Sequence, residues 1–229
     1  GTPAAAPMTL WEASQDLFSF FGADNENLTK GMEAGVVPWW ADPHLEIRFW
    51  RPISAVTHWL DYQLWPNSSM LMHLHSALWY TLLVFAYGYF LREFRFQGWA
   101  LLAAMMAYGM DASHIPSIAW VANRNILLST FFAFLSLAKL NHAVKSNSKL
   151  SLGLSCVFFA ASLLSAEAGI STAAYIASYF LFMDTRRLRL RISTYLPYAL
   201  VLVGWRVLYH AMGYAVKNSG AYFDPVAQP

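Results

Sequence analysis

The sequence has a single cysteine, Cys156, and few charges, since Asp, Glu, Lys and Arg together make up only 12% of its 229 residues. A lone cysteine excludes an intrachain disulfide and a cysteine-rich metal site. A soluble domain ordinarily carries about twice this fraction of charge, so a conventional water-soluble enzyme and a disordered chain are both disfavoured. The sequence also lacks a P-loop, a dinucleotide fingerprint, a zinc-protease motif and a basic–aromatic patch for nucleic acid.

Apolar residues are correspondingly abundant. They make up 57% of the chain, 17% of its residues are aromatic, and the mean hydropathy is +0.37. Six apolar runs follow residue 69, at 70–91, 98–110, 126–144, 150–165, 169–183 and 195–212. A helix needs about 20 apolar residues to cross a bilayer, and three of these runs are shorter. We interpret all six as transmembrane helices, which makes the lipid bilayer the first expected partner.

The charges between the runs alternate in sign. If all six runs cross, one side holds nine of the 15 basic residues and only two of the 13 acids, Glu93 and Asp184. Cytoplasmic loops are enriched in Lys and Arg, so this side is predicted to be cytoplasmic. The nine basic residues are Arg92, Arg95, Lys139, Lys145, Lys149, Arg186, Arg187, Arg189 and Arg191.

The sequence therefore predicts an all-α, polytopic membrane protein in three parts. Residues 1–69 form a polar extracytoplasmic loop region with short amphipathic helices, residues 70–213 a transmembrane helical domain, and residues 214–229 an extracytoplasmic tail. The chain starts at Gly1 without a methionine, and residues 1–69 are too long for a simple connector. We expect a fragment of a larger multi-pass protein of the bacterial inner (plasma) membrane, completed by missing N- and C-terminal portions or by a protein partner.

Two candidate binding residues lie near the first run. Arg51 has a planar guanidinium that suits phosphate oxygens, and the alternative is that it pairs with a nearby acid. His73 and His75 are two residues apart, so on a helix they point about 200° apart and do not ligate one metal together. We expect His75 to face the site and assign no metal ligands.

The segment 111–125 concentrates polar groups between two apolar runs. Asp111 and His114 become neighbours if the turn between them is helical, and a carboxylate there can act as a base or hold the imidazole. Pro116 is expected to break the preceding helix and Asn123 to cap the next. Arg124 adds a positive charge at that helix start, where an anionic phosphate binds favourably. The alternative is a polar loop with no chemical role.

Glu167 is the only acid between Asp111 and Asp184, and it lies in a turn of small residues. Ionisable groups at membrane depth are costly and usually functional, which makes Glu167 a candidate catalytic acid. The alternative is a turn acid exposed to water.

Three sequence blocks resemble motifs of polytopic C-type glycosyltransferases, the GT-C superfamily, and they occur in that family's order. The first is Phe49-Trp50-Arg51-Pro52 followed by His73-Leu74-His75-Ser76, the second is His114-Ile-Pro116 with Ala119-Trp120-Val121-Ala-Asn123-Arg124-Asn125-Ile-Leu127-Leu128, and the third is Leu164-Ser165-Ala166-Glu167-Ala168-Gly169. The resemblance covers residues 49–182 and includes bacterial lipid-sugar transferases and transmembrane-TPR O-mannosyltransferases.

The resemblance implies a multi-helix membrane glycosyltransferase that moves a sugar from a polyprenyl-phosphate carrier to an extracytoplasmic acceptor, in some members with a divalent cation. Together with the polar groups expected on one face, it leads us to expect a catalytic set of Asp111, His114 and Glu167 and a substrate-binding set of Arg51, His75, Asn123 and Arg124. A family glutamate is Ser117 here and a family lysine is Ala166, and these departures favour the rival interpretation, a non-catalytic membrane scaffold or assembly subunit. A transporter ranks last, because it needs ionisable groups near the midplane.

Overall fold

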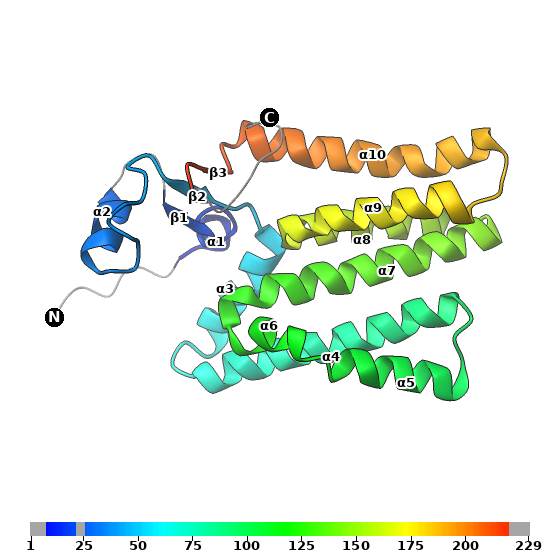
Figure 1. Ribbon diagram of the computed structural model, residues 1–229, viewed down its shortest axis with the longest axis horizontal. Helices are drawn as coiled ribbons and strands as arrows, with labels where there is room; N and C mark the ends of the chain where they lie inside the picture. The colour runs from blue at the N-terminus through cyan, green and yellow to red at the C-terminus, as the bar shows by residue number, and fades with distance from the viewer. Residues whose placement is uncertain (1–7, 22–25, 220–229) are drawn as a thin grey trace.

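The computed structural model describes residues 8–21 and 26–219, and most of them are helical. A bundle of long helices lies beside a small lobe that contains a three-stranded sheet (Figure 1). The bundle consists of α4 (Ser69–Glu93), α5 (Gly98–Gly109), α7 (Arg124–Ser146), α8 (Lys149–Ser165), α9 (Ile170–Ser178), the π-helix η4 (Tyr179–Met183) and α10 (Leu188–Ala211). The lobe consists of α1 (Leu10–Asp16), β1 (Ser19–Phe21), α2 (Glu26–Glu33), β2 (Glu46–Arg48) and β3 (Ala215–Lys217). Between them lie α3 (Pro52–Leu64), α6 (Ile115–Ala119) and the short 3-10 turns η1 (Ala112–His114), η2 (Val121–Asn123) and η3 (Glu167–Gly169).

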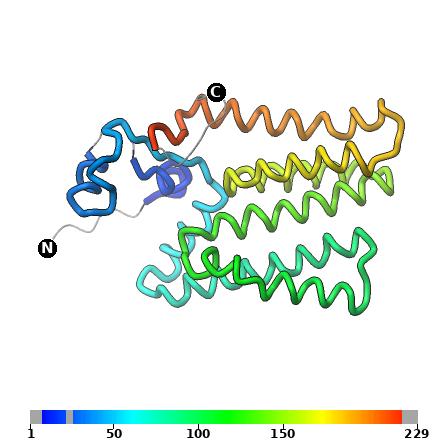
Figure 2. Tube along the Cα trace, viewed as in Figure 1, coloured from blue at the N-terminus to red at the C-terminus, as the bar shows by residue number. Residues whose placement is uncertain are grey.

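The sheet joins the two ends of the described chain. Strand β2 pairs antiparallel with β1 and with β3, which follows α10, and Ile47 is opposite Val216. In Figure 2 the red segment that follows α10 lies beside the blue N-terminal segments. Tyr214 is buried and donates from its hydroxyl to the carbonyl oxygen of Gln15 at 2.9 Å. The helical class is confirmed, but the all-α prediction missed this sheet. Residues 214–219, expected in a separate tail, pack against the N-terminal region, and residues 220–229 lie outside the described residues.

Each apolar run of the sequence is helical in the structure. Two helical segments are long and apolar enough to cross a membrane, Ser69–Glu93 and Val121–Ser146. Gly98–Gly109 and Lys149–Ser165 are shorter apolar helices. The last run belongs to α10, which begins about two turns before that run, at Leu188, and these added turns contain Arg189 and Arg191.

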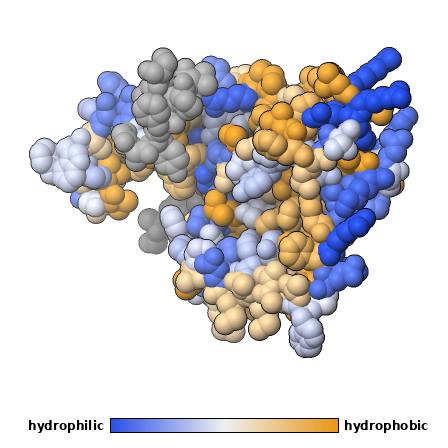
Figure 3. Space-filling view, turned by 45° about the vertical axis from the view of Figure 1, so that its right-hand side comes forward, coloured by the Kyte–Doolittle hydropathy of each residue, from blue (hydrophilic) through white to orange (hydrophobic). Residues whose placement is uncertain are grey.

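The connections between the long helices lie alternately at the two ends of the bundle. Connections 94–97, 147–148 and 184–187 lie at the end away from the lobe, which we call the basic end (Figure 1). Connections 110–123 and 166–169 lie at the opposite end, which we call the lobe end. Hydrophilic side chains gather along one edge of the bundle beside a largely apolar surface (Figure 3).

The surface of the bundle is unusually apolar. Helix α5 buries none of its residues, and Trp99 on that helix is 86% exposed. Phe182 of η4 is 81% exposed, and Leu200 of α10 is 63% exposed. Apolar patches of this extent are rare on soluble monomers and mark surfaces that contact lipid or a partner protein.

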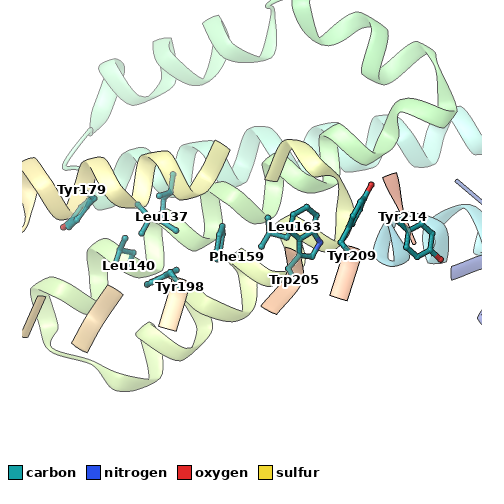
Figure 4. Close-up of a cluster of buried hydrophobic side chains, with 10 residues drawn as sticks. Leu137, Leu140, Phe159, Leu163, Tyr179, Tyr198, Trp205, Tyr209 and Tyr214 are labelled. Carbon is teal, nitrogen blue, oxygen red and sulfur yellow. The ribbon is translucent and has the colours of Figure 1, made fainter. Parts of the chain in front are cut away.

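The bundle interior is built largely from aromatic and leucine side chains of α7, α8, η4 and α10. In Figure 4 they form a row that begins near Tyr179 and ends at Tyr214, at the edge of the lobe. The buried members of this core are Leu137, Leu140, Phe159, Leu163, Ile176, Tyr179, Tyr198, Trp205, Tyr209 and Tyr214. The core therefore continues from the bundle toward the sheet and supports the lobe end.

Serine side chains hold α7 against α8. The hydroxyl of Ser129 lies 3.1 Å from that of Ser162, and the hydroxyl of Ser136 lies 3.3 Å from that of Ser155. Each of these serines also donates to the main-chain carbonyl of its partner at 2.6–3.0 Å. Small residues and hydroxyl hydrogen bonds at a helix interface are typical of packing in membranes, where apolar burial alone does not drive helices together.

The turn between α7 and α8 is set by local geometry. Helix α7 ends at Asn147, which adopts the left-handed conformation with φ 52°. Ser148 then caps α8 by accepting a hydrogen bond from the Ser151 backbone N–H at 3.2 Å. Asparagine is one of the few residues that tolerates the left-handed region, so the connection closes with only two residues.

A close approach at Gly169 determines where the turn that carries Glu167 lies. A Cβ atom at Gly169 would lie 2.7 Å from the main-chain carbon and oxygen of Ser162. Real Cβ contacts are longer than this, so only glycine fits without moving the backbone. The small residues in the sequence around Glu167 therefore allow η3 to pack directly against α8.

Candidate functional site

The site residues predicted from the sequence lie at the lobe end, in three separate groups. Arg51 pairs with Glu167, and Arg124 lies against His75. Asp111, His114 and Asn123 lie along the 110–123 connection. The first two groups bring together residues that are 116 and 49 positions apart in the sequence.

The first group is a buried ion pair between α3 and α7. Nη2 of Arg124 lies 2.6 Å from Oδ2 of Asp61, and the side chains are 0% and 1% exposed. The Arg124 Nε donates to the Ser76 hydroxyl at 2.9 Å, and its Nη2 donates to the main-chain oxygen of Met72 at 2.8 Å. Every nitrogen of the guanidinium has a partner within the protein, including Nη1, which donates to Thr57 at 3.4 Å. Arg124 therefore fixes α3, α4 and α7 together, and its fully buried guanidinium is not accessible to an external phosphate in this conformation.

His75 extends this ion pair toward the surface. Its Nδ1 lies 2.6 Å from Oδ1 of Asp61, and the indole Nε1 of Trp79 donates to its Nε2 at 3.0 Å. An indole N–H only donates, so Nε2 must be unprotonated and the proton must sit on Nδ1, directed at Asp61. This assignment follows from the hydrogen-bond network and fixes the imidazole in one orientation.

His58, one turn before Asp61 on α3, completes the buried cluster. Its side chain packs on Phe18, with ring centroids 5.7 Å apart, and its Nε2 is buried with no hydrogen-bond partner among residues 8–21 and 26–219. Burial lowers the pKa of His58 to about 4, and the nearby Arg124 charge lowers the pKa further while Asp61 opposes the shift. His58 is therefore an uncharged imidazole beside a buried ion pair.

The second group lies at the junction of the lobe and the bundle. Arg51 donates from Nε to Oε2 of Glu167 at 2.8 Å, and its Nη2 lies 2.6 Å from the same oxygen. Its guanidinium lies over the Phe49 ring at 4.0 Å. The Tyr209 hydroxyl donates to Oε1 of Glu167 at 3.2 Å, and Asn125, with its amide oxygen turned toward Arg51, accepts from Nη1 at 3.1 Å.

The Arg51–Glu167 pair is less buried than the Asp61–Arg124 pair. The Arg51 and Glu167 side chains are 13% and 26% exposed. Of the two predicted alternatives for Arg51, pairing with an acid is the one seen in this conformation, although that acid, Glu167, lies 116 positions away in the sequence. The pair remains accessible to a ligand that approaches from the lobe end.

The third group is only partly open to solvent, because Asp111 is exposed whereas His114 and Asn123 are half-buried. Asp111 is exposed and caps η1, and the Ser113 backbone N–H, which donates to its Oδ1 at 2.8 Å, lowers the pKa of this carboxyl. The turn to His114 is a 3-10 helix, which meets the condition under which Asp111 and His114 were expected to be neighbours, and the His114 backbone N–H donates to the Asp111 carbonyl at 3.2 Å. The His114 ring packs against Tyr108 and Tyr80, with centroids 4.5 and 5.4 Å away.

Two predictions for this connection were wrong in detail. Helix α5 ends at Gly109, well before Pro116, which instead occupies the first turn of α6, where a missing N–H costs nothing. Asn123 takes the N-cap position of α7, but its side chain makes no capping hydrogen bond. Its amide donates to the Ser117 hydroxyl at 3.2 Å and so ties α6 to the start of α7.

Sequence reasoning missed most partners of the site. Asp61 and His58 share one face of α3, and this i,i+3 spacing was the one local signal that they act together. Nothing local pointed to Ser76 or Tyr209, which join the site from α4 and α10. Such partners can be identified only from the folded structure, because each contact joins residues more than forty positions apart in the sequence.

The residues present do not fit a divalent cation. Within residues 8–21 and 26–219, no three His, Cys, Asp or Glu side chains gather as a metal site. The carboxylates of Asp61 and Glu167 are instead paired with arginines. We therefore assign no step to a metal.

A groove opens beside His75 on the outside of α4. It has a volume of about 540 Å³ and is lined by Trp65, Leu71, Leu74, His75, Ala77, Leu78 and Thr81. Volumes of this size are typical of ligand sites, and the lining is almost entirely apolar. The groove thus places two polar side chains, His75 and Thr81, along an otherwise apolar surface.

No protein-family model, no curated protein and no solved structure matches this chain. The resemblance to the GT-C motifs therefore stays a hypothesis that rests on the residues themselves.

Proposed function

We propose that the chain is an integral membrane protein that crosses the bilayer six times, with its basic end in the cytoplasm. Two of its helical segments satisfy the length and hydropathy of a membrane span, and apolar side chains cover the bundle surface. The connections at one end of the bundle, taken with the helix ends that flank them, carry nine of the 15 Lys and Arg. This distribution agrees with the positive-inside rule.

Cysteine labelling tests this topology. In a Cys156→Ser background, Asp111→Cys and Arg187→Cys each place one thiol at an exposed position, at the lobe end and the basic end respectively. A membrane-impermeant maleimide added to intact cells should label the first and not the second. Detergent-permeabilised cells are the control, because both should then react. Labelling of both sites in intact cells would refute the topology.

We further propose that the lobe end binds a polyprenyl-phosphate sugar and takes part in transfer of the sugar to an extracytoplasmic acceptor. One observation carries this proposal: residues from all three motif blocks contact one another, and one of them, His75, lines an apolar groove on the bundle surface. Arg51 of the first block meets Glu167 of the third, and Arg124 of the second meets His75 of the first. A substrate with a long apolar chain and a phosphorylated head needs such a groove next to polar groups.

The chemistry can be written with the chain's own residues. The bond between the anomeric carbon and the phosphate oxygen breaks, polyprenyl phosphate leaves, and the acceptor hydroxyl oxygen bonds to the anomeric carbon after losing its proton. Arg51 supplies positive charge to the leaving phosphate, and Glu167, freed from Arg51 by that phosphate, takes the proton. Asp111 and His114 line the acceptor side, and Arg124 positions His75 and the α3–α4–α7 junction.

Photo-labelling tests the groove. The full-length chain in nanodiscs should be labelled on α4 by a polyprenyl phosphate that carries a diazirine in its chain. Leu78→Trp fills the groove and should lower the labelling at least about tenfold, the scale on which a pocket discriminates by one or two methylene-sized groups. Phe85→Trp is the matched control, because Phe85 is 64% exposed on the same helix but lies outside the groove. Equal labelling in the wild type and Leu78→Trp would refute the proposal.

The second candidate is a non-catalytic scaffold that keeps the fold. It is favoured by the commitment of both guanidinium groups to carboxylates within the protein. Release of polyprenyl phosphate from polyprenyl-phosphate hexoses discriminates the two. An enzyme should release it and lose the activity in Glu167→Gln, whereas a scaffold should bind the lipid without product.

A further inference from the structure

A second apolar groove lies between α9, η4 and α10, toward the basic end of the bundle. It has a volume of about 380 Å³ and is lined almost wholly by apolar side chains: Ala173, Ile176, Ala177, Phe180, Ile192, Tyr195, Leu196, Tyr198, Ala199 and Leu202. Neither wall is a regular α-helix throughout. Residues 179–183 form a π-helix, and Pro197 lies within α10, where it removes a backbone donor from the hydrogen-bond ladder.

Two rows of α10 side chains run along this groove, and each row begins with an arginine. Residues 189, 192, 196 and 199 repeat at helical spacing along one row, and residues 191, 195, 198 and 202 repeat along the next. Arg189 and Arg191 therefore sit at the mouth of the groove, one at the start of each row. Arg187, the N-cap of α10, adds a third positive charge at the same place.

These arginines differ in how they are engaged. Arg191 donates to the main-chain oxygen of Phe180 and lies over the ring of that groove residue at 4.3 Å, while its Nε is buried with no partner within the described chain. Arg187 and Arg189 are exposed, and neither forms an ion pair with any residue in 8–21 or 26–219. Arg186 is different, because it is already paired with Asp184 at 2.7 Å. The mouth of an apolar groove therefore carries uncompensated positive charge.

We propose that this groove binds an anionic phospholipid of the inner leaflet, with one acyl chain between α9 and α10 and the headgroup phosphate at Arg187, Arg189 and Arg191. The occupant follows from complementarity: the groove offers apolar walls to a chain, and its mouth offers guanidinium donors to a phosphate. Basic pockets between helices on the cytoplasmic side recognise anionic headgroups in this way. The inference rests on the membrane placement proposed above and is independent of the sugar substrate.

Native mass spectrometry of the full-length chain in a nonionic detergent tests the site, with dioleoyl-phosphatidylglycerol and dioleoyl-phosphatidylcholine as the two probes. The wild type should bind phosphatidylglycerol more tightly. Arg189→Gln should weaken that binding about fivefold, the factor for one basic residue at an anionic surface, and leave phosphatidylcholine unchanged. Ala177→Trp, at an exposed groove position, should weaken both lipids because it occupies the acyl-chain space.

Arg92→Gln is the matched control, because Arg92 is exposed at the same basic end but lies at the end of α4, outside the groove. Its affinity for either lipid should equal that of the wild type. Three results would overturn the inference: no preference for phosphatidylglycerol, an equal loss in Arg92→Gln and Arg189→Gln, or unchanged binding in Ala177→Trp. This assay contains no sugar donor. If phosphatidylglycerol binding fails while polyprenyl phosphate still labels α4, only the lipid site is refuted. Lost photo-labelling with intact phosphatidylglycerol binding refutes only the proposed transfer function.

Discussion

Replacement of Arg124 by methionine should lower the free energy of unfolding by about 3–5 kcal/mol, because it leaves the Asp61 carboxylate buried without its counter-charge. Asp61 is 1% exposed, so water does not reach it to replace the guanidinium. The hydrogen bonds that Arg124 donates to Ser76 and Met72 are lost in the same substitution. Equilibrium unfolding of the full chain in detergent measures the loss.

The double substitution Asp61→Leu with Arg124→Met should recover a large part of that stability. Buried ion pairs replaced by apolar side chains of similar volume are often neutral or more stable, since both desolvation penalties disappear. Recovery should be incomplete, because His75 loses the acceptor for its Nδ1 proton. Arg51→Met is the matched control at the same end of the bundle, and its more exposed ion pair should cost less. A double variant no more stable than Arg124→Met would show that the buried charge is not the cause.

His58 should make the protein less stable as the pH falls from about 6.5 to about 4. The pKa of His58 is lowered to about 4 in the folded chain, whereas an unfolded histidine has a pKa of about 6.5. Between these values the unfolded chain binds the extra proton, so the stability that is fully present above pH 6.5 is lost as the pH falls through this window. The loss amounts to about 3 kcal/mol.

The difference in unfolding free energy between the wild type and His58→Phe, measured from pH 7 to pH 4, isolates this contribution. Phenylalanine keeps the ring contact with Phe18 and cannot be protonated. The wild-type advantage should shrink by about 3 kcal/mol over the range. His44→Phe, at an exposed histidine of the lobe, is the matched control. A difference that does not change with pH would contradict the prediction.

The helices of the bundle could be predicted from the sequence, because a long apolar run specifies its own structure locally. The run at 70–91 became Ser69–Glu93, and the run at 126–144 became Arg124–Ser146. The sheet could not be predicted, since its three-residue strands have no local pattern and the whole bundle separates β2 from β3 in the sequence. Distant pairing, rather than local propensity, forms this part of the chain.

The candidate site was predicted unevenly for the same reason. Rare polar residues within apolar sequence, such as Arg51, Arg124 and Glu167, were identifiable because a charge there needs a partner. The sequence did not show which residue each of these charges pairs with. Asp61 was the decisive example: it binds Arg124 and His75, which lie on two other helices. Long side chains that meet across helices are positioned by the packing of those helices, and a sequence pattern does not contain that packing.

The serine pairs between α7 and α8 do not by themselves fix how the two helices are aligned. If one helix slid by seven residues along the other, Ser129 would lie opposite Ser155, and the interface would still contain one serine pair. The serines alone therefore specify the alignment only weakly. Such a shift moves the helix about 10 Å along its axis, and a two-residue connection spans at most about 7 Å. The turn at Asn147 and Ser148 therefore forbids the slip, and loss of either serine pair should loosen the hairpin without changing which residues face each other.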